Sequence, residues 1–158
     1  MAQTIISGGS NKSENVPTYA QGAMTDKEAV CTVMRRSRKT GGVLIKESQV
    51  QQFQAWFRTL AKRGYVTSAF LQDKDKVRET FRREFPNGMT RGQYVRSILT
   101  YFSGLDEVDF PKQFPDIDRE ETVNDLLRIA SEGSKDHRIH LANKQKRVPG
   151  ASAFVDSA

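Results

Sequence analysis

Cysteine is almost absent from this sequence of 158 residues, and its scarcity excludes two kinds of stabilisation. The single Cys31 cannot form an intrachain disulfide, and it cannot build a zinc site from several thiolates. Histidine is nearly as scarce, because only His137 and His140 occur, and we interpret both as surface residues of a polar helix. A catalytic triad needs a histidine base that a third group holds in place. We therefore expect no bound metal ion and no catalytic site.

Long hydrophobic runs are also missing. No stretch approaches the roughly 18 apolar residues of a membrane span. The first ten residues, MAQTIISGGS, lack the basic start and the apolar core of a secretory signal. The phosphate-cradling patterns GxxxxGKS, GxxxxGKT and GxGxxG do not occur. We expect a non-enzymatic protein without a cofactor or a membrane contact, intracellular (cytoplasmic) or in a virion, and not secreted.

Charge is abundant, with basic residues in excess and unevenly placed. The chain has 25 Lys and Arg against 19 Asp and Glu, a formal net charge of +6. Residues 25–104 hold sixteen cations and seven carboxylates, whereas residues 105–133 hold three cations and nine carboxylates. Such asymmetry indicates partners rather than fold. It predicts binding to nucleic acid, and self-association of the acidic segment 105–133 with the basic surface of a neighbouring copy.

Hydrophobic periodicity predicts helices through the middle of the chain. Apolar stripes with a spacing of three or four residues recur, most of them after a capping residue (Thr25, Ser48, Thr90 or Asp118) and before a glycine. We expect Asp73 to break the third helix or to start a new one, and Gly133 to end the fifth. The sequence predicts an all-α, compact bundle of five or six short helices, at about 25–38, 48–63, 67–85, 90–103, 118–132 and, for the short sixth, 135–143.

The two ends of the chain lack such stripes. Residues 1–24 are rich in Gly, Ser and Asn and are predicted to form a flexible N-terminal arm, because they cannot bury enough apolar surface. Residues 144–158 are predicted to be a flexible basic C-terminal tail. The helical domain is then 25–143, and within it residues 105–117 contain Pro111 and Pro115, which favour an extended connector. We expect Phe110 and Phe114 to pin that connector to the core.

The same stripes predict which side chains are buried. The expected core residues are large and apolar, and they repeat on one side of each helix: Val50, Phe53, Phe57, Leu60, Phe81, Ile98, Phe102, Val123, Leu126 and Leu127. Most aromatic residues fall on these stripes. Three tyrosines adjoin basic residues and are candidates for stacking on unpaired bases: Tyr65, Tyr94 and Tyr101.

Basic clusters are the strongest functional signal. Cations in the last turn of a helix have a structural explanation, because they complement the helix dipole. Four cations just before Gly41 and Gly42 are not fully explained in this way, and arginine binds phosphate bidentately. We predict that the following residues bind nucleic acid: Arg35, Arg36, Arg38, Lys39, Arg82, Arg83, Arg91, Arg96, Lys144, Lys146 and Arg147.

Three functions fit these observations. The first is a structural protein that self-assembles along nucleic acid, RNA in preference to DNA, as a coat-like or nucleocapsid-like subunit. The second is a DNA- or RNA-binding regulator, for which the residues around Gly64 offer a superficial helix-turn-helix pattern. The third is a protein-interaction or assembly module with incidental basic patches. A coat-like subunit covers a fixed number of nucleotides with little sequence preference, whereas a regulator prefers one site.

Overall fold

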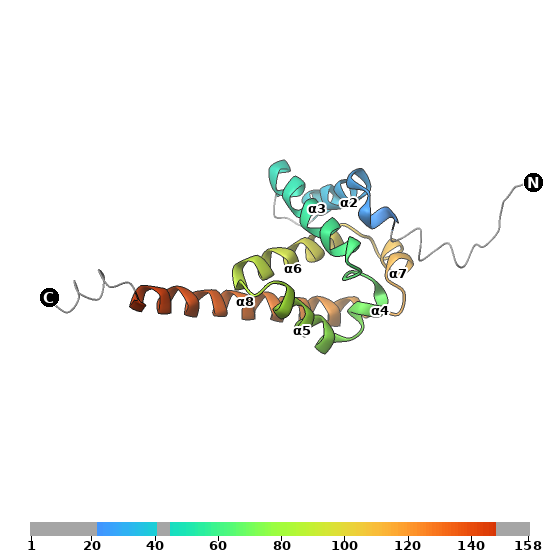
Figure 1. Cartoon of the computed structure of the whole chain (residues 1–158). Coiled ribbons are helices and arrows are strands. Elements are labelled where there is room, and N and C mark those ends of the chain that lie inside the picture. Colours follow the sequence, from blue (N-terminus) through green and yellow to red (C-terminus); the bar gives the residue numbers. More distant parts are fainter. Residues whose placement is uncertain (1–21, 41–44, 148–158) are drawn as a thin grey trace, which may run out of the picture.

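The computed structural model describes residues 22–40 and 45–147, and of residues 38–40 and 145–147 it describes the backbone alone. Within these ranges the chain is all-α, as predicted, and it forms no strand. A single helical turn at residues 22–25 precedes seven helices (Figure 1). Its first three residues were predicted to belong to the flexible arm, but Met24 is buried in the core, and the rest of that arm lies outside the described residues. The bounds of the seven helices are α2 Lys27–Thr40, α3 Glu47–Lys62, α4 Ser68–Leu71, α5 Lys74–Glu84, α6 Gly88–Ser103, α7 Asp109–Gln113 and α8 Arg119–Arg147.

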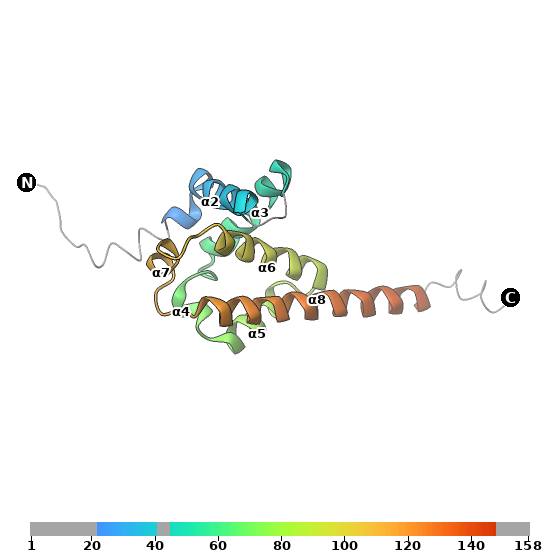
Figure 2. The ribbon, with the colours of Figure 1, turned by 180° about the vertical axis from the view of Figure 1, so that it is seen from behind.

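Helix α6 lies at the centre of the molecule. It packs on α8 along one side and on α2 and α3 along the other, while α5 lies against α8 (Figures 1 and 2). The long α8 extends past the rest of the helices at its C-terminal end, at the opposite end of the molecule from α7. None of the described helices combines the length and the apolar character that crossing a membrane requires.

The core is built largely from aromatic rings. Phe57 of α3 stacks on Tyr101 of α6 with ring centroids 4.2 Å apart, and Phe102 contacts Phe114 at 4.8 Å. Seven of the ten predicted core residues are buried, and Phe53 and Val123 are partly buried against the core. Leu127 was predicted to be buried and is 49% exposed, because the side of α8 that faces α6 carries Leu126, Ile129 and Ala130 instead.

Three predicted helix caps are displaced by one to three residues. Ser48 lies inside α3, whose N-cap is Lys46. Asp26, not Thr25, caps α2, because its Oδ1 accepts from the backbone N–H of Ala29 at 2.8 Å. Asn87, not Thr90, caps α6, and its Oδ1 accepts from the N–H groups of Met89 and Thr90. Both residues are strong N-caps. The predicted cap at Asp118 is confirmed, since its Oδ1 accepts from the N–H of Glu121 at 3.0 Å.

The predicted third helix is divided at Asp73. Its Oδ1 accepts from the N–H of Lys76 at 3.1 Å, so Asp73 is the N-cap of α5. The part before it, α4, has four residues only. The helix directly after the turn at Gly64 is therefore α4, which is too short to lie in a major groove as a recognition helix, and Asp73 separates it from α5. The superficial helix-turn-helix pattern thus lacks its second helix at the expected place.

The proline-containing connector is partly helical. Phe110 and Phe114 are buried and pin it to the core, as predicted. The short helix α7 contains Phe110 and ends just before Phe114, and the prediction of an extended segment missed it. Pro111 is the third residue of α7. The first four N–H groups of a helix have no acceptor within it, so the missing N–H of a proline at this position removes no helix hydrogen bond. Asp106 stabilises the start of α7 by accepting from the N–H groups of Val108 and Asp109.

Gly133 does not end a helix, contrary to the prediction. Helix α8 runs through it without interruption and continues to Arg147, beyond the predicted boundary at residue 143. Gly133 is instead the point where α8 meets the start of α6. A Cβ atom on Gly88 would lie 1.9 Å from the carbonyl oxygen of Gly133, so the two backbones can approach this closely only because both residues are glycine.

Candidate nucleic-acid interface

The predicted basic cluster of α2 is partly neutralised by carboxylates. Arg35 Nη2 lies 2.9 Å from Glu47 Oε2, and this hydrogen bond raises the pKa of Arg35 above its ordinary value. Arg36 Nη1 lies 3.7 Å from Asp109 Oδ2. Arg38 and Lys39 belong to the last turn of α2, and their side chains lie outside the described part of the chain. A phosphate at this cluster would therefore compete with two carboxylates.

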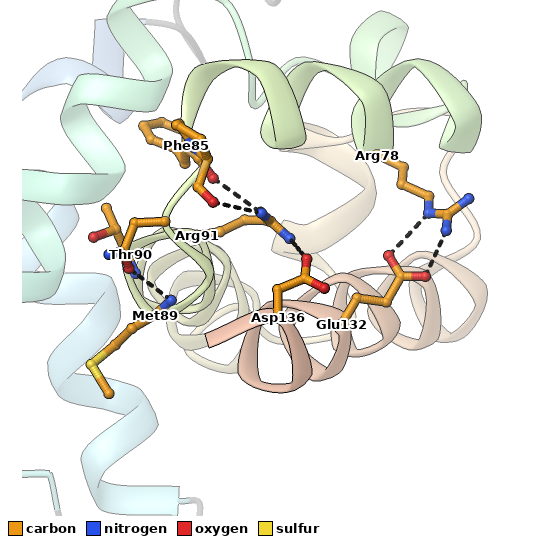
Figure 3. Close-up of polar contacts among 9 residues, drawn as sticks. Arg78, Phe85, Met89, Thr90, Arg91, Glu132 and Asp136 are labelled. Carbon is orange, nitrogen blue, oxygen red and sulfur yellow. Dashed lines mark hydrogen bonds and ion pairs between the residues drawn. The ribbon is translucent and has the colours of Figure 1, made fainter. Parts of the chain in front are cut away.

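Arg91 cannot bind a phosphate in this fold. It is 3% exposed, and its guanidinium holds the turn between α5 and α6 against α8 (Figure 3). Nε donates to the carbonyl oxygen of Phe85 at 3.0 Å and Nη2 to that of Pro86 at 3.1 Å. Nη1 donates to Asp136 Oδ2 at 3.0 Å. We correct the prediction: Arg91 is a structural residue. Its partners lie in the turn after α5 and on α8, and the pattern of cations along the chain gave no sign of them.

The remaining predicted cations lie at separate places. Arg82 and Arg83 are exposed in the last turn of α5, where Arg83 Nε is 3.8 Å from Glu84 Oε2. Lys144 is exposed near the end of α8, and the side chains of Lys146 and Arg147 lie outside the description. Arg96 is exposed on α6, and it makes no ion pair with a described residue. The predicted cations whose side chains are described therefore do not form one cluster.

Arg96 borders two hollows on one side of α6. The first, of about 210 Å³, lies between α6 and α8 and is lined by Gly88, Met89, Gly92, Arg96, Ser134, His137 and Arg138. The second, of about 290 Å³, lies among α2, α3 and α6 and is lined by Ser37, Ile45, Phe53, Arg96, Leu99, Thr100 and Ser103. We call the two hollows together the α6 groove. Because Arg96 lines both, they adjoin each other at its side chain.

The lining of the α6 groove contains no carboxylate. Arg96 and Arg138 are exposed cations, neither makes an ion pair with a described carboxylate, and Ser134 contributes a hydroxyl group. Phe53 is partly exposed, and its ring is held at 5.7 Å from that of Trp56. Arginine can bind phosphate oxygens, and a partly exposed aromatic ring can stack on a base. The groove thus has the chemistry of a single-stranded nucleic-acid site.

The sequence interpretation missed Ser134, His137 and Arg138. His137 was interpreted as a surface residue of a polar helix, and nothing in its neighbourhood along the chain points to α6. The three residues share a site with Arg96 only because α8 crosses α6 at Gly133. The one local sign of the site is the spacing of His137 and Arg138, three and four residues after Ser134, which places the three side chains on one side of α8. Such a spacing of polar residues is common on exposed helices.

The tyrosine rings proposed for base stacking are used inside the protein. Tyr101 is 1% exposed and stacks on Phe57, and its hydroxyl donates to Gln113. Tyr94 and Tyr65 are partly buried, stacked on Phe85 at 4.1 Å and on Phe70 at 5.1 Å. Tyr101 is therefore excluded as a base-stacking residue, since its ring is covered.

A hollow on another side of α8, where it faces α5, also contains two arginines but has carboxylates beside them. This hollow, of about 300 Å³, is lined by Lys74, Asp75, Arg78, Asp125, Arg128, Ile129 and Glu132, and we call it the α5–α8 face. Arg78 binds Glu132 bidentately, at 3.0 Å from Nε to Oε1 and 2.8 Å from Nη2 to Oε2 (Figure 3). These hydrogen bonds lower the pKa of Glu132. Arg128 Nη1 lies 3.1 Å from Asp125 Oδ1.

Metal and thiol chemistry have no setting in the described residues. No group of three His, Cys, Asp or Glu side chains there lies close enough to hold a metal ion. Cys31 is fully buried, and burial raises the pKa of its thiol, so little thiolate forms at neutral pH. Reactive cysteines have the opposite environment, exposed and with a lowered pKa.

Comparison of this chain with protein-family models, with curated proteins and with solved structures finds no match. A functional argument for this protein therefore has to come from its own side chains.

Proposed function

We propose that this protein is a non-enzymatic, nucleic-acid-binding structural protein that self-assembles along RNA or DNA, as a coat-like or nucleocapsid-like subunit does. RNA is the preferred partner, and a virion or the cytoplasm is the place where such a subunit acts. The α6 groove carries the proposal, because Arg96 and Arg138 line it without a carboxylate and Arg96 shares the second hollow with the partly exposed ring of Phe53.

The uneven distribution of charge supports the same proposal. Most of the cations precede residue 105, and nine of the carboxylates lie in residues 105–133. A subunit that repeats along a polyanion needs cations for the phosphates and complementary surfaces for its neighbours. Non-specific binding to nucleic acid depends on phosphate contacts, and it weakens as the salt concentration rises.

The test compares two pairs of arginines. The variant Arg96→Ala/Arg138→Ala removes the two cations of the α6 groove, and Arg78→Ala/Arg128→Ala removes two arginines that have carboxylate partners. Binding of a single-stranded RNA oligonucleotide is measured by fluorescence anisotropy over a range of salt concentrations. Each phosphate contact on a single strand contributes about 0.7 to the salt slope. We expect the groove variant to lose about 1.4 of that slope and the control variant to keep it.

Other outcomes separate the competing functions. If the unmodified protein shows no salt-dependent binding to RNA or DNA, the coat-like proposal fails and an interaction module becomes the better interpretation. If binding is strong at one sequence only, the protein is a regulator. If both arginine pairs change the slope equally, the α6 groove is not the binding site.

A further inference from the structure

The end of α8 stands clear of the rest of the described chain. Every residue from Arg138 to Lys144 is exposed, which covers nearly two turns and thus all sides of the helix. A helix that is solvated on all sides is usually polar all round. This one carries Ile139, 54% exposed, and Leu141, 46% exposed. We call the exposed residues of α8 from Lys135 to Lys144 the basic end.

Charge at this end is positive and mostly unpaired. Lys135, Arg138 and Lys144 make no ion pair with a described residue, while Asp136 is bound to Arg91. His137 and His140 add no negative charge. The basic end therefore combines cations with two exposed aliphatic side chains.

The opposite end of the molecule has the complementary composition. Glu107 in the loop before α7, and Glu120 and Glu121 in the first turn of α8, are exposed and have no ion pair with a described residue. Val108, beside Glu107, is 62% exposed. We call these four residues the acidic end.

Arg119 holds the parts of the acidic end together. It is the first residue of α8, and its Nη1 donates to the carbonyl oxygen of Leu105 at 3.0 Å. Its guanidinium also lies over the ring of Phe110 in α7, with Cζ 4.8 Å from the centroid. The carboxylates of α8 and the exposed Val108 are thus kept on one end of the molecule, and Figures 1 and 2 show that end to be opposite the basic end.

We infer that the basic end of one copy docks on the acidic end of the next copy, through lysines against glutamates and through one exposed aliphatic side chain of α8 against Val108. Ile139 and Leu141 lie on opposite sides of α8, so only the one on the docked side contacts Val108. Single exposed aliphatic residues are common on protein surfaces. Here exposed aliphatic residues occur at both ends of the molecule. Those of the basic end lie beside unpaired positive charges, and Val108 of the acidic end lies beside unpaired negative charges. Contacts between different surfaces at opposite ends are heterologous, and they build open chains or rings. This inference rests on the proposed function and names the surface through which it assembles.

The experiment measures self-association without nucleic acid, so that it is independent of RNA binding. Two charge-reversal variants are made: Glu107→Lys/Glu120→Lys at the acidic end and Lys135→Glu/Lys144→Glu at the basic end. None of these four residues lines the α6 groove. The control, Lys62→Glu/Glu79→Lys, reverses two exposed charges elsewhere. Mass distributions are followed by sedimentation velocity as a function of concentration.

We expect the unmodified protein and the control to form a series of species larger than a dimer. Each reversal variant alone should associate at least about tenfold more weakly, because like charges then meet at the contact. An equimolar mixture of the two variants should recover association, since each altered end then finds an opposite charge. The uncharged variant Val108→Ser should also weaken association.

Three results would overturn the inference: a mixture that does not recover, reversal variants that associate like the unmodified protein, or an unmodified protein that stays monomeric both alone and with single-stranded RNA. A species that stops at a dimer would contradict the head-to-tail arrangement. Failure of the proposed function has a different signature, because association would then persist while the salt-dependent binding of RNA is absent.

Discussion

The α6 groove and the α5–α8 face both contain two arginines, but only the second surrounds them with carboxylates. Arg96 and Arg138 line the groove with no acidic residue among the lining side chains. On the α5–α8 face, Arg78 is bound to Glu132 and Arg128 to Asp125. The difference teaches that a count of cations along a chain does not measure its attraction for phosphate. What matters is whether the fold brings a carboxylate to each cation.

Whether a carboxylate lies beside it also separates the arginines that the sequence predicted to bind nucleic acid. Arg91 is held inside the protein, Arg35 and Arg36 have carboxylate partners, and Arg96 faces the groove without one. A phosphate that approaches a paired arginine must displace or share its carboxylate, and it also meets that negative charge. We therefore rank the groove above the α2 cluster as the site of binding, although the α2 cluster is denser in the sequence.

The largest effect is expected where α6 and α8 cross, since this crossing places Arg138 beside Arg96. In Gly88→Ala the new Cβ atom would lie 1.9 Å from the carbonyl oxygen of Gly133, so the two helices must separate. Overpacking costs about 1–3 kcal/mol, and contact with a rigid backbone belongs at the upper limit of that range or above it. Unfolding in urea measures the loss.

The matched control for this substitution is Gly92→Ala, one turn further along α6. Its Cβ atom would lie 4.0 Å from the carbonyl oxygen of Ala130, an ordinary contact. Alanine is the better helix former by about 1 kcal/mol, so Gly92→Ala should be neutral or stabilising. Equal destabilisation by both substitutions would show that the crossing does not depend on Gly88.

The second effect separates two arginines of the same helix. Arg91→Ala removes the donor from two carbonyl oxygens and from Asp136, and an unsatisfied buried polar group costs about 1–3 kcal/mol. Arg96→Ala removes an exposed side chain and should change the free energy of unfolding by less than about 0.5 kcal/mol. Thermal or urea unfolding of the two variants tests this directly. The reverse order of destabilisation would contradict the assignment of Arg91 as structural.

A third substitution tests the rank of the two basic sites. We expect Arg35→Ala/Arg36→Ala to reduce the salt slope of RNA binding by less than the value of about 1.4 expected for two free phosphate contacts. Its effect on stability should be small, because the ion pairs of both residues are exposed. Fluorescence anisotropy against salt gives the comparison. A larger loss than in Arg96→Ala/Arg138→Ala would make the α2 cluster the main contact.

The smallest effect concerns pH on the α5–α8 face. The hydrogen bond from Arg78 lowers the pKa of Glu132 from its ordinary value of 4.5. A lowered carboxylate pKa stabilises the fold at pH values above 4.5, and this contribution is lost as the pH falls through the folded-state pKa. Because the pair is exposed, its contribution is small.

Between pH 6 and pH 3, Glu132→Gln should therefore lose slightly less stability than the unmodified protein. Urea unfolding at each pH measures the free energy of unfolding of both. The pKa of Asp106 is also lowered, by hydrogen bonds from the backbone of Asp109 and Val108, and its loss in acid is common to both proteins. If Glu132→Gln instead became more stable than the unmodified protein as the pH rises above 4.5, the ion pair would not stabilise the fold.

Sequence patterns predicted the elements of this fold well where the physical cause is local. Helical spacing of Val50, Phe57 and Leu60 follows from the side that a helix buries, and all three are buried. The cap at Asp118 and the break at Asp73 depend on a side chain and a backbone N–H three residues apart. The hydrophobic stripe of α8 was less well predicted, because Leu126 and Leu127 are adjacent and only packing on α6 selects the first.

The sequence by itself determined that the protein is all-α, where most of its helices lie and which side of most of them is apolar, because periodicity and capping act within a few residues. The tertiary structure alone decided the role of Gly133, which the pattern marks as a helix end and the fold uses as a crossing point. It also decided which arginines are paired. Arg91 and Asp136 are 45 residues apart in the chain, and the distance between a cation and a carboxylate that far apart depends on how the helices pack.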